Sequence, residues 1–237
     1  GSSRYYEGGN FMKKIAVVTG ASSGMGREFV LQLSQYVEVD EIWVIARRQA
    51  ALDSLKEESS IPVRSVVLDL LDSNSFAQFA KLLEEEKPDV KLLVNAAGFG
   101  KFGAYHKVPV ADELRMIDLN CKALVLMTRL CIPYMTEGSH ILQLDSLSAF
   151  QPVPYIATYG ATKAFVLSYS RAMNQELKHK GIRVMAMNPA WVKTEFFDHA
   201  FQTNGDGEVK NFNYVFTRIT QFSHLWHPKK RNRNRSF

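Results

Sequence analysis

A tyrosine and a lysine four residues apart, in the segment Tyr159-Gly-Ala-Thr-Lys163, form the most informative pair in the sequence. Residues four apart on a helix share one face, so the two side chains are expected to meet. A phenol has a pKa of about 10 and is a poor base at neutral pH. A neighbouring ammonium stabilises the phenolate and lowers that pKa, so the pair could exchange a proton with an alcohol or a carbonyl. Such pairs also occur at ordinary protein surfaces, so the prediction depends on the rest of the chain.

Two polar residues earlier in the chain extend this constellation. Ser146 follows a predicted strand at 139–145, and its hydroxyl could donate a hydrogen bond to a substrate oxygen. Ser148 is a nearby alternative whose position fits less well. Asn120 lies in a predicted helix at 111–136, where a purely structural role is the alternative.

A glycine-rich loop follows the first apolar run of the chain. Glycines at 20, 24 and 26 come directly after residues 13–20, which predict a buried strand, and a helix pattern begins at Gly24. Gly20 permits a tight turn, whereas Gly24 and Gly26 let backbone and helix approach a pyrophosphate closely. The helix N-terminus adds N–H groups and a favourable dipole. The loop therefore predicts a dinucleotide site, with an ordinary βα turn as the alternative.

Two arginines end the second predicted strand. Dinucleotide folds that prefer NAD place an acidic residue here, against the ribose 2′-hydroxyl. This chain has Ala46-Arg47-Arg48 instead. Arginine pairs well with phosphate, which favours NADP over NAD, although two solvated surface charges would give the same sequence.

The glycine spacing GxxxGxG, preceded by Thr19, resembles the short-chain dehydrogenase/reductase family, whose single-domain members carry TGxxxGxG at this place. Further motifs follow in the family's order: Asp69-Leu70, Asn95-Ala96-Ala97-Gly98, the serine, and the Tyr-Lys pair. The family's serine usually stands within a Ser-Ser pair, where this chain has Asp145-Ser146. The segment 188–194 (NPAWVKT) resembles the family's NPGxVxT, with Ala190 in place of glycine. The resemblance covers residues 13–195.

The resemblance implies a role for each matching residue. Tyr159 would act as the acid/base and Ser146 would polarise the substrate oxygen, while Lys163 would lower the tyrosine pKa and hold the nicotinamide ribose. Asn120 would hold a water in a proton relay to the lysine. The implied cofactor-binding residues are Gly20, Ser22, Ser23, Gly24, Met25, Gly26, Arg47, Arg48, Asp69, Leu70, Asn95, Ala96, Gly98, Tyr159, Lys163, Pro189, Val192 and Thr194.

The elements that must position these residues alternate between strand and helix. Strands are expected at 13–20, 41–46, 63–69, 91–95, 139–145 and 182–187, and helices at 24–36, 49–58, 73–87, 111–136 and 157–180. This alternation predicts an α/β fold, a three-layer, doubly wound parallel sheet of the Rossmann-like kind. The carboxyl ends of the strands would share one edge, where ligands bind in such sheets.

The pattern changes after Thr194. Residues 196–216 could form a short lid. Residues 217–237 contain no apolar run of the kind that a seventh strand needs, so we expect that strand to be missing. We expect a tag remnant or disordered segment at 1–12, one dinucleotide-binding and catalytic domain at 13–216, and an atypical basic tail at 217–237. His224 and His227 lack further ligands nearby and predict no metal site.

Composition excludes several other classes of function. The net charge of +5 resides in the tail, because without Lys229, Lys230, Arg231, Arg233 and Arg235 the chain has 24 basic and 24 acidic residues. This balance argues against a nucleic-acid partner. No apolar run reaches the roughly 18 residues of a membrane span. Cys121 and Cys131 lie too far apart along one predicted helix for a disulfide, which indicates reduced thiols and a cytoplasmic protein.

These observations predict an NADP(H)-dependent oxidoreductase that acts on a small-molecule alcohol or carbonyl substrate. A catalytically silent, nucleotide-binding or regulatory protein of the same fold is the alternative, and a nucleotide-sugar epimerase would need a longer chain. The family's long helices imply a homodimer or homotetramer. The site is flanked in sequence by apolar residues that could line a substrate pocket or simply pack the core: Phe99, Phe102, Tyr105, Phe150, Pro152 and Trp191.

Overall fold

The computed structural model describes residues 12–189 of the chain. Several predictions concern residues outside this range. They are the N-terminal segment, the lid at 196–216, the basic tail, the missing seventh strand, and the cofactor contacts of Val192 and Thr194.

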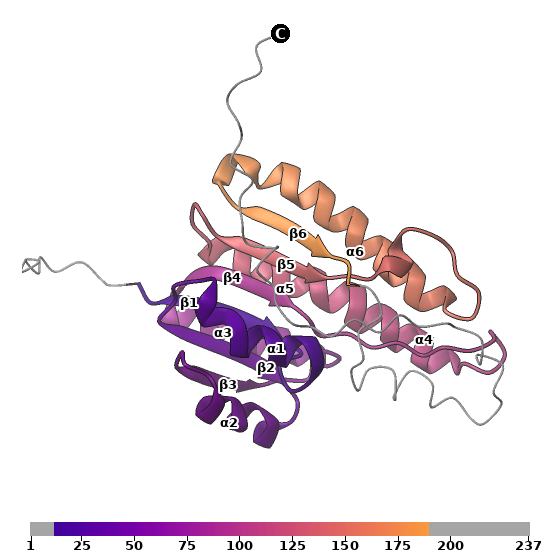
Figure 1. Cartoon of the computed structure of the whole chain (residues 1–237), viewed down its shortest axis with the longest axis horizontal. Coiled ribbons are helices and arrows are strands. Elements are labelled where there is room, and N and C mark those ends of the chain that lie inside the picture. Colours follow the sequence, from indigo (N-terminus) through magenta and orange to yellow (C-terminus); the bar gives the residue numbers. More distant parts are fainter. Residues whose placement is uncertain (1–11, 190–237) are drawn as a thin grey trace, which may run out of the picture.

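Six parallel strands form one sheet (Figure 1). They are β1 Lys14–Thr19, β2 Glu41–Ala46, β3 Val63–Val67, β4 Asp89–Asn95, β5 His140–Leu144 and β6 Arg183–Met187. Their spatial order is β3-β2-β1-β4-β5-β6. The predicted doubly wound α/β fold with six strands is therefore confirmed. The chain reverses direction across the sheet between β1 and β4, and this switch point is where open α/β sheets bind ligands.

The strands are apolar on both sides because helices cover both faces of the sheet. Ile15 and Val17 of β1 face one core cluster, and Ala16 and Val18 face the other. All four side chains are fully buried. Strands of this kind read as continuous β-branched runs rather than as alternating patterns, which is why they could be found in the sequence.

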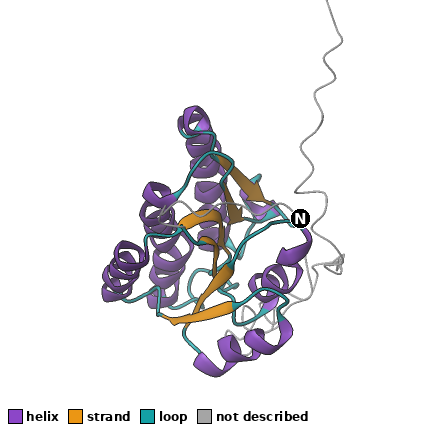
Figure 2. Cartoon of the chain, turned by 90° about the vertical axis from the view of Figure 1, so that its left-hand side faces the viewer, coloured by secondary structure: helices purple, strands orange, loops and turns teal. Residues whose placement is uncertain are grey.

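Two layers of helices pack on the sheet (Figure 2). The first contains α3 Ser73–Glu86, α5 Leu124–Cys131 and α6 Ala157–Glu176. The second contains α1 Gly24–Gln32 and α2 Gln49–Glu58. Leu52 and Leu55 illustrate the second layer, since both are fully buried against the sheet.

The predicted continuous helix at 111–136 is wrong in its middle. The structure has α4 Val110–Ile117, a π-helical turn at Asp118–Ala123, then α5 and a 3-10 helix at Ile132–Tyr134. A π turn is wider than an α turn and occurs most often at functional sites. It contains Asn120, whose side chain bonds the backbone of Phe99 after β4. Periodicity alone does not reveal such a turn, because the flanking α turns keep the apolar pattern.

Other element ends differ by a few residues. β3 ends at Val67 rather than at residue 69, since Asp69 Oδ1 accepts a hydrogen bond from Leu71 N at 3.0 Å and starts a turn. The first helix ends at Gln32 and continues as the 3-10 helix Leu33–Gln35. The helix predicted at 157–180 ends at Glu176, and a 3-10 helix follows at Lys178–Lys180.

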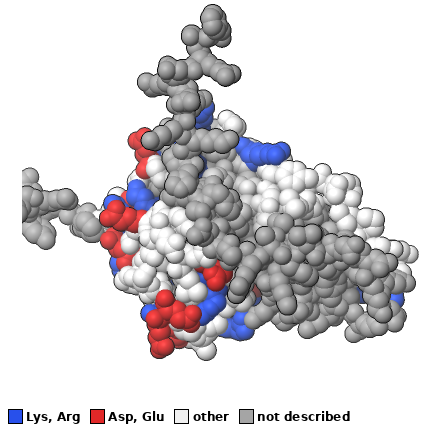
Figure 3. All heavy atoms as spheres, viewed as in Figure 1, with Lys and Arg blue, Asp and Glu red and all other residues white. Residues whose placement is uncertain are grey.

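The described part of the chain contains no helix long and apolar enough to cross a membrane. Acidic and basic side chains lie side by side over the end of the molecule that carries α2 and the start of β1 (Figure 3). Cys121 and Cys131 are both buried and free, in agreement with the prediction of reduced thiols.

Candidate active site

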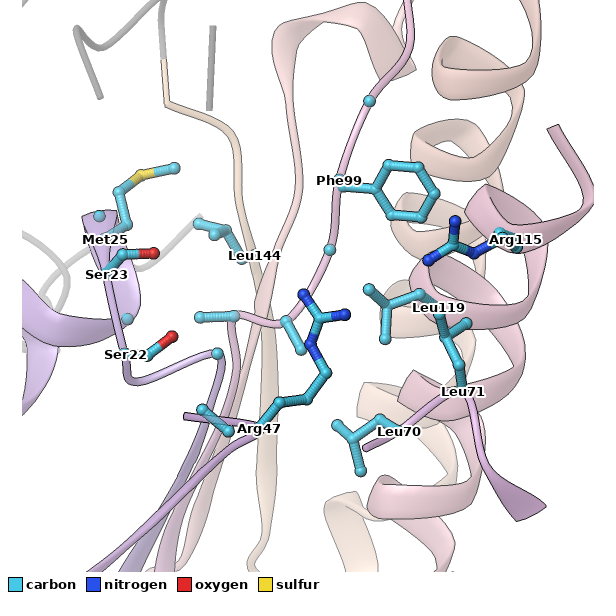
Figure 4. A pocket seen from close by; sticks show the side chains of 18 of the residues that line it. Ser22, Ser23, Met25, Arg47, Leu70, Leu71, Phe99, Arg115, Leu119 and Leu144 are labelled. Carbon is cyan, nitrogen blue, oxygen red and sulfur yellow. The ribbon is translucent and has the colours of Figure 1, made fainter. Parts of the chain in front are cut away.

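A cavity of about 680 Å³ opens at the carboxyl edge of the sheet, beside the ends of β1 and β4 (Figure 4). It is lined by the loop after β1, the ends of β2 to β5, and the starts of α1 and α6. The predicted site residues that line it are Gly20, Ser22, Ser23, Gly24, Met25, Gly26, Arg47, Arg48, Asp69, Leu70, Ala96, Gly98, Ser146, Tyr159, Lys163 and Pro189. The fold thus brings together residues from motifs spread over most of the described chain.

The glycine loop leaves no space for side chains at two of its positions. A Cβ on Gly20 would lie 2.7 Å from the backbone N of Ala97, and its φ of +64° is a conformation that only glycine adopts freely. A Cβ on Gly26 would collide with the carbonyl of Gly20. This geometry agrees with the tight turn predicted at Gly20. The close approach to a pyrophosphate predicted for Gly24 and Gly26 stays a prediction.

A threonine fastens the loop to the neighbouring strand. Thr19 Oγ1 accepts hydrogen bonds from the backbone N–H groups of Ala96 and Ala97, both at 3.1 Å. The start of the Asn95–Gly98 motif is thereby fixed beside the glycine loop. The two motifs, far apart in sequence, form one rim of the cavity.

The N-terminus of α1 points into this rim. Its N-cap residue Ser23 makes no side-chain capping bond, and the first turn contains no acidic residue. The hydroxyls of Ser22 and Ser23 lie on the side of the cavity opposite Leu70 (Figure 4). Free N–H groups, serine hydroxyls and a positive dipole end together suit a phosphate group.

Arg47 extends from the end of β2 into the middle of the cavity opening (Figure 4). Arg48, beside it, is the N-cap residue of α2. Both side chains are exposed. Two guanidinium groups at this edge, with no carboxylate in the Ala46–Arg48 segment, are suited to a phosphate on the adenosine ribose.

The cavity wall also contains residues that were not predicted as cofactor contacts, among them Phe99, Arg115 and Leu119. Arg115 and Leu119 share one side of the helix that includes α4, and Phe99 lies opposite them (Figure 4). The guanidinium carbon of Arg115 lies 5.9 Å from the centre of the Phe99 ring. Arg115 and Leu119 are four residues apart and come shortly before Asn120, and this spacing is a sequence signal that could have revealed them.

The catalytic candidates lie at the other end of the cavity. Tyr159 is in the first turn of α6 and is 7% exposed, and a side-chain hydrogen bond joins it to Ser146. Ser146 begins the 3-10 helix Leu147–Ala149, and its Oγ accepts a bond from the Ser148 hydroxyl at 3.0 Å. Ser146 lines the cavity. The alternative serine, Ser148, does not line it and instead donates its hydrogen bond to Ser146.

The Tyr159 phenol is surrounded by apolar groups. Phe102 packs edge-on against its ring at 5.3 Å, within a cluster that includes Met116 and Ile156. Burial raises the pKa of Tyr159, and the hydrogen bond from Ser146 opposes this rise. The net shift of the Tyr159 pKa in this structure is upward, opposite to the predicted lowering, and burial is its largest cause. The predicted role of Lys163 in lowering this pKa stays a prediction. Lys163 Nζ faces the ring, 5.6 Å from its centre.

Lys163 is itself buried, with 6% of its surface exposed. Its Nζ donates a hydrogen bond to the carbonyl of Leu144 at 2.8 Å. Burial lowers the pKa of Lys163 to about 8, although the charge of Asp145 opposes this change. A Cβ on Gly98 would lie 3.9 Å from Nζ, so the glycine gives the ammonium room beside the cavity.

Asn120 is held on the far side of Gly98. Its Nδ2 donates to the carbonyl of Phe99 at 2.9 Å and to Thr162 Oγ1 at 3.1 Å, and its Oδ1 accepts from Phe99 N at 3.0 Å. Both amide donors are therefore used, and one lone pair of Oδ1 is left for a water. Asn120 is 1% exposed and lies outside the cavity lining, so the predicted relay stays a prediction.

Asn95 also lies behind the cavity. Its Nδ2 donates to Gln143 Oε1 at 2.8 Å and to Thr128 Oγ1 at 3.1 Å. Gln143 Nε2 bonds the same threonine at 3.0 Å. This buried triad joins β4, β5 and α5, which gives Asn95 a supporting role, and its predicted contact with the cofactor stays a prediction.

Comparisons with known proteins agree with this geometry. The family model described as short chain dehydrogenase matches residues 14–205. Sulfoacetaldehyde reductase 2 of Chromohalobacter salexigens is 34% identical over 219 residues, 89% of this chain and 84% of the relative. NADP-dependent 3-hydroxy acid dehydrogenase YdfG of Escherichia coli (strain K12) is 32% identical over 200 residues, 83% and 79% of the two chains.

The fold is also similar to solved structures. The closed form of a serine dehydrogenase complexed with NADP+ superposes with a TM-score of 0.74 at 31% identity, over 89% of this chain and 86% of that one. The predicted family is thus confirmed by sequence and by structure. The chain belongs to the short-chain dehydrogenase/reductase family of oxidoreductases.

Proposed function

We propose that the protein is an NADP(H)-dependent oxidoreductase that interconverts an alcohol and a carbonyl, with Tyr159 as the acid/base. The observation that carries this proposal is the convergence of Ser146, Tyr159 and Lys163 on the cavity that the glycine loop and Arg47 also line. The nicotinamide, when bound, supplies or accepts the hydride. The protein supplies binding, orientation and the proton.

The residues at the other end of the cavity fit a dinucleotide phosphate. The backbone at Gly20 and Gly26 leaves no room for side chains, and Ser23 leaves the N-terminus of α1 uncapped. Arg47 and Arg48 suit the 2′-phosphate of NADP. The NADP dependence of the YdfG relative and the NADP+ bound in the serine dehydrogenase support the same choice.

In the reducing direction Tyr159 donates its proton to the substrate oxygen. Its raised pKa keeps the phenol protonated at neutral pH, which is the form that donation requires. Ser146 holds the same oxygen by a hydrogen bond and shares its developing negative charge. Lys163 stabilises the phenolate that is left and binds the ribose of the nicotinamide. In the oxidising direction the proton returns to Tyr159 from the alcohol.

A spectrophotometric assay tests the proposal. The purified protein is mixed with NADPH, or with NADH for comparison, and with a panel of aldehydes, ketones and 3-oxo acids that includes sulfoacetaldehyde. We expect substrate-dependent oxidation of NADPH, faster than that of NADH. Binding of NADPH without turnover of any compound would favour the silent, nucleotide-binding alternative. The assembly as a homodimer or homotetramer remains a prediction from the resemblance, and the cytoplasmic location remains a prediction from the two separated cysteines.

A further inference from the structure

A buried carboxyl group lies between the catalytic serine and the end of β5. Asp145 is 2% exposed, and it lines the cavity beside Ser146. The family's usual residue at this place is a second serine, so the resemblance gives Asp145 no role. Burying a carboxylate costs free energy unless the charge is paired. A buried Asp145 beside the reacting groups therefore needs a partner.

The carboxyl group is only partly satisfied. Asn188 Nδ2, after β6, donates to Asp145 Oδ2, and the backbone N–H of Asp145 donates to the carbonyl of Met187 at 2.8 Å. Oδ1 is buried and finds no hydrogen-bond partner among residues 12–189. The Ser146 backbone also bonds the carboxyl group. The position of the side chain is therefore fixed, but one of its two oxygens, Oδ1, is left without a hydrogen bond from any described residue. An ammonium group nearby would neutralise its charge.

The nearby ammonium belongs to Lys163. Its Nζ bonds the carbonyl of Leu144, the residue directly before Asp145, at 2.8 Å. In the described part of the chain the charged and titratable groups that act on Lys163 are Asp145, from the end of β5, and Cys121, from the π-helical turn. The groups that act on Asp145 are Lys163 and the more exposed Arg171 of α6, with hydrogen bonds from Asn188 and the Ser146 backbone. Tyr159, also of α6, feels the charge of Asp145 as well.

We propose that Asp145 is a positioning residue of the reaction, a buried counter-charge that keeps Lys163 protonated beside Tyr159. The proposal rests on the proposed function and adds a residue to it. A thiol that stays protonated offers no charge, and burial raises the pKa of Cys121 to about 11. Asp145 therefore supplies the negative charge for Lys163.

The pair has a limited range of pH in which both members are charged. Burial raises the pKa of Asp145 to about 6, and burial lowers the pKa of Lys163 to about 8. Between these values the carboxylate and the ammonium stabilise each other. Below this range Asp145 is neutral and Lys163 loses its counter-charge, and above it Lys163 itself loses its proton. Lys163 still holds its proton below this range, so the pairing sets only the alkaline limb of kcat/KM, which follows the loss of the Lys163 proton.

The test compares the wild type with Asp145→Asn, which keeps an acceptor for Asn188 and removes the charge. We expect the alkaline limb of kcat/KM to move down by about one pH unit, an activity loss of about fivefold at pH 8 that approaches tenfold at higher pH. Asp145→Ser replaces the carboxyl group by the serine that the family usually has at this place. It should shift the alkaline limb in the same direction. Asp89→Asn, at the opposite end of the sheet and also buried, is the matched control and should leave the pH profile unchanged.

A second measurement is independent of turnover. In protein labelled with 13C at the lysine ε carbon, the Lys163 resonance is assigned by its absence in Lys163→Arg and is titrated by NMR. We expect its midpoint to be about one pH unit lower in Asp145→Asn than in the wild type. An unchanged midpoint would overturn the inference, even in an active enzyme. A shifted midpoint in a protein that reduces no carbonyl would uphold the charge pairing and overturn the proposed function instead.

Discussion

The two ends of the cavity are built on different physical principles. At the end formed by β1 and β2, glycine backbone, serine hydroxyls and exposed arginines offer shape and surface charge. At the end formed by β5 and α6, Asp145, Tyr159 and Lys163 are each less than a tenth exposed and have shifted pKa values. The first end is suited to a charged ligand that binds through contacts formed in water. At the second end, burial excludes water, which shifts the pKa values of the groups and strengthens the effect of each neighbouring charge on them.

The largest effect is expected at the buried end, from Tyr159→Phe. This change removes the proton donor but keeps the ring that packs on Phe102 at 5.3 Å. General acid–base catalysis contributes about 10²- to 10⁴-fold in rate, so kcat/KM should fall by about 10³-fold. NADPH affinity, measured by fluorescence titration, should change little, because the glycine loop and arginines are untouched. A variant with full activity would remove Tyr159 from the mechanism.

At the exposed end the sharpest test is Gly20→Ala. The new Cβ would lie 2.7 Å from Ala97 N at a φ of +64°, so the loop must move to accept it. We expect NADPH affinity to fall by about 100-fold or more, since the backbone that meets the phosphates is displaced.

Gly138→Ala is the matched control for this change. Gly138 has a φ of +86°, but a Cβ there would meet nothing within 4 Å. The control should therefore lose about 1 kcal/mol of unfolding free energy from backbone strain, with unchanged NADPH affinity. Equal loss of affinity in both variants would show that the strained backbone conformation, and not close packing of the loop, accounts for the effect of Gly20→Ala.

A smaller effect is expected from Arg47→Ala. A hydrogen-bonded charge pair with a phosphate contributes about 1.5 to 3 kcal/mol, so KM for NADPH should rise about 10- to 100-fold. KM for NADH, which lacks the 2′-phosphate, should change little. Because Arg47 is exposed, the preference for NADPH should also weaken as salt is added. An equal rise of KM for both cofactors would place Arg47 away from the 2′-phosphate.

The exposed end was the more predictable from sequence. The glycines and the paired arginines have local signatures, and the strand-turn-helix context places them without knowledge of distant contacts. The six strands were also predictable, because buried parallel strands are short, continuous apolar runs. Arg115 was missed because its importance depends on which side of α4 faces the cavity.

The buried end was predictable in its residues but not in its electrostatics. The spacing of Tyr159 and Lys163 correctly indicated neighbours, yet the direction of the Tyr159 pKa shift depends on burial, which sequence does not give. The π-helical turn that holds Asn120, and the triad that uses Asn95, depend on contacts between elements far apart in the chain. The role inferred for Asp145 depends on the same kind of contact.

The smallest effect concerns how the buried end changes stability with pH. The pKa of Asp145 is raised from 3.8 to about 6, so the folded protein binds a proton more tightly than the unfolded chain does. Its contribution to stability is therefore complete below pH 3.8 and is lost as the pH rises through about 6, by at most ~3 kcal/mol. Asp145→Asn removes this dependence, so its melting temperature should vary less than that of the wild type between about pH 4 and 6.5. At neutral pH the net gain should be small, because the unpaired Lys163 ammonium then destabilises the fold. If the melting temperatures of the two proteins changed equally with pH across this range, that result would contradict a buried, titrating carboxyl group at the end of β5.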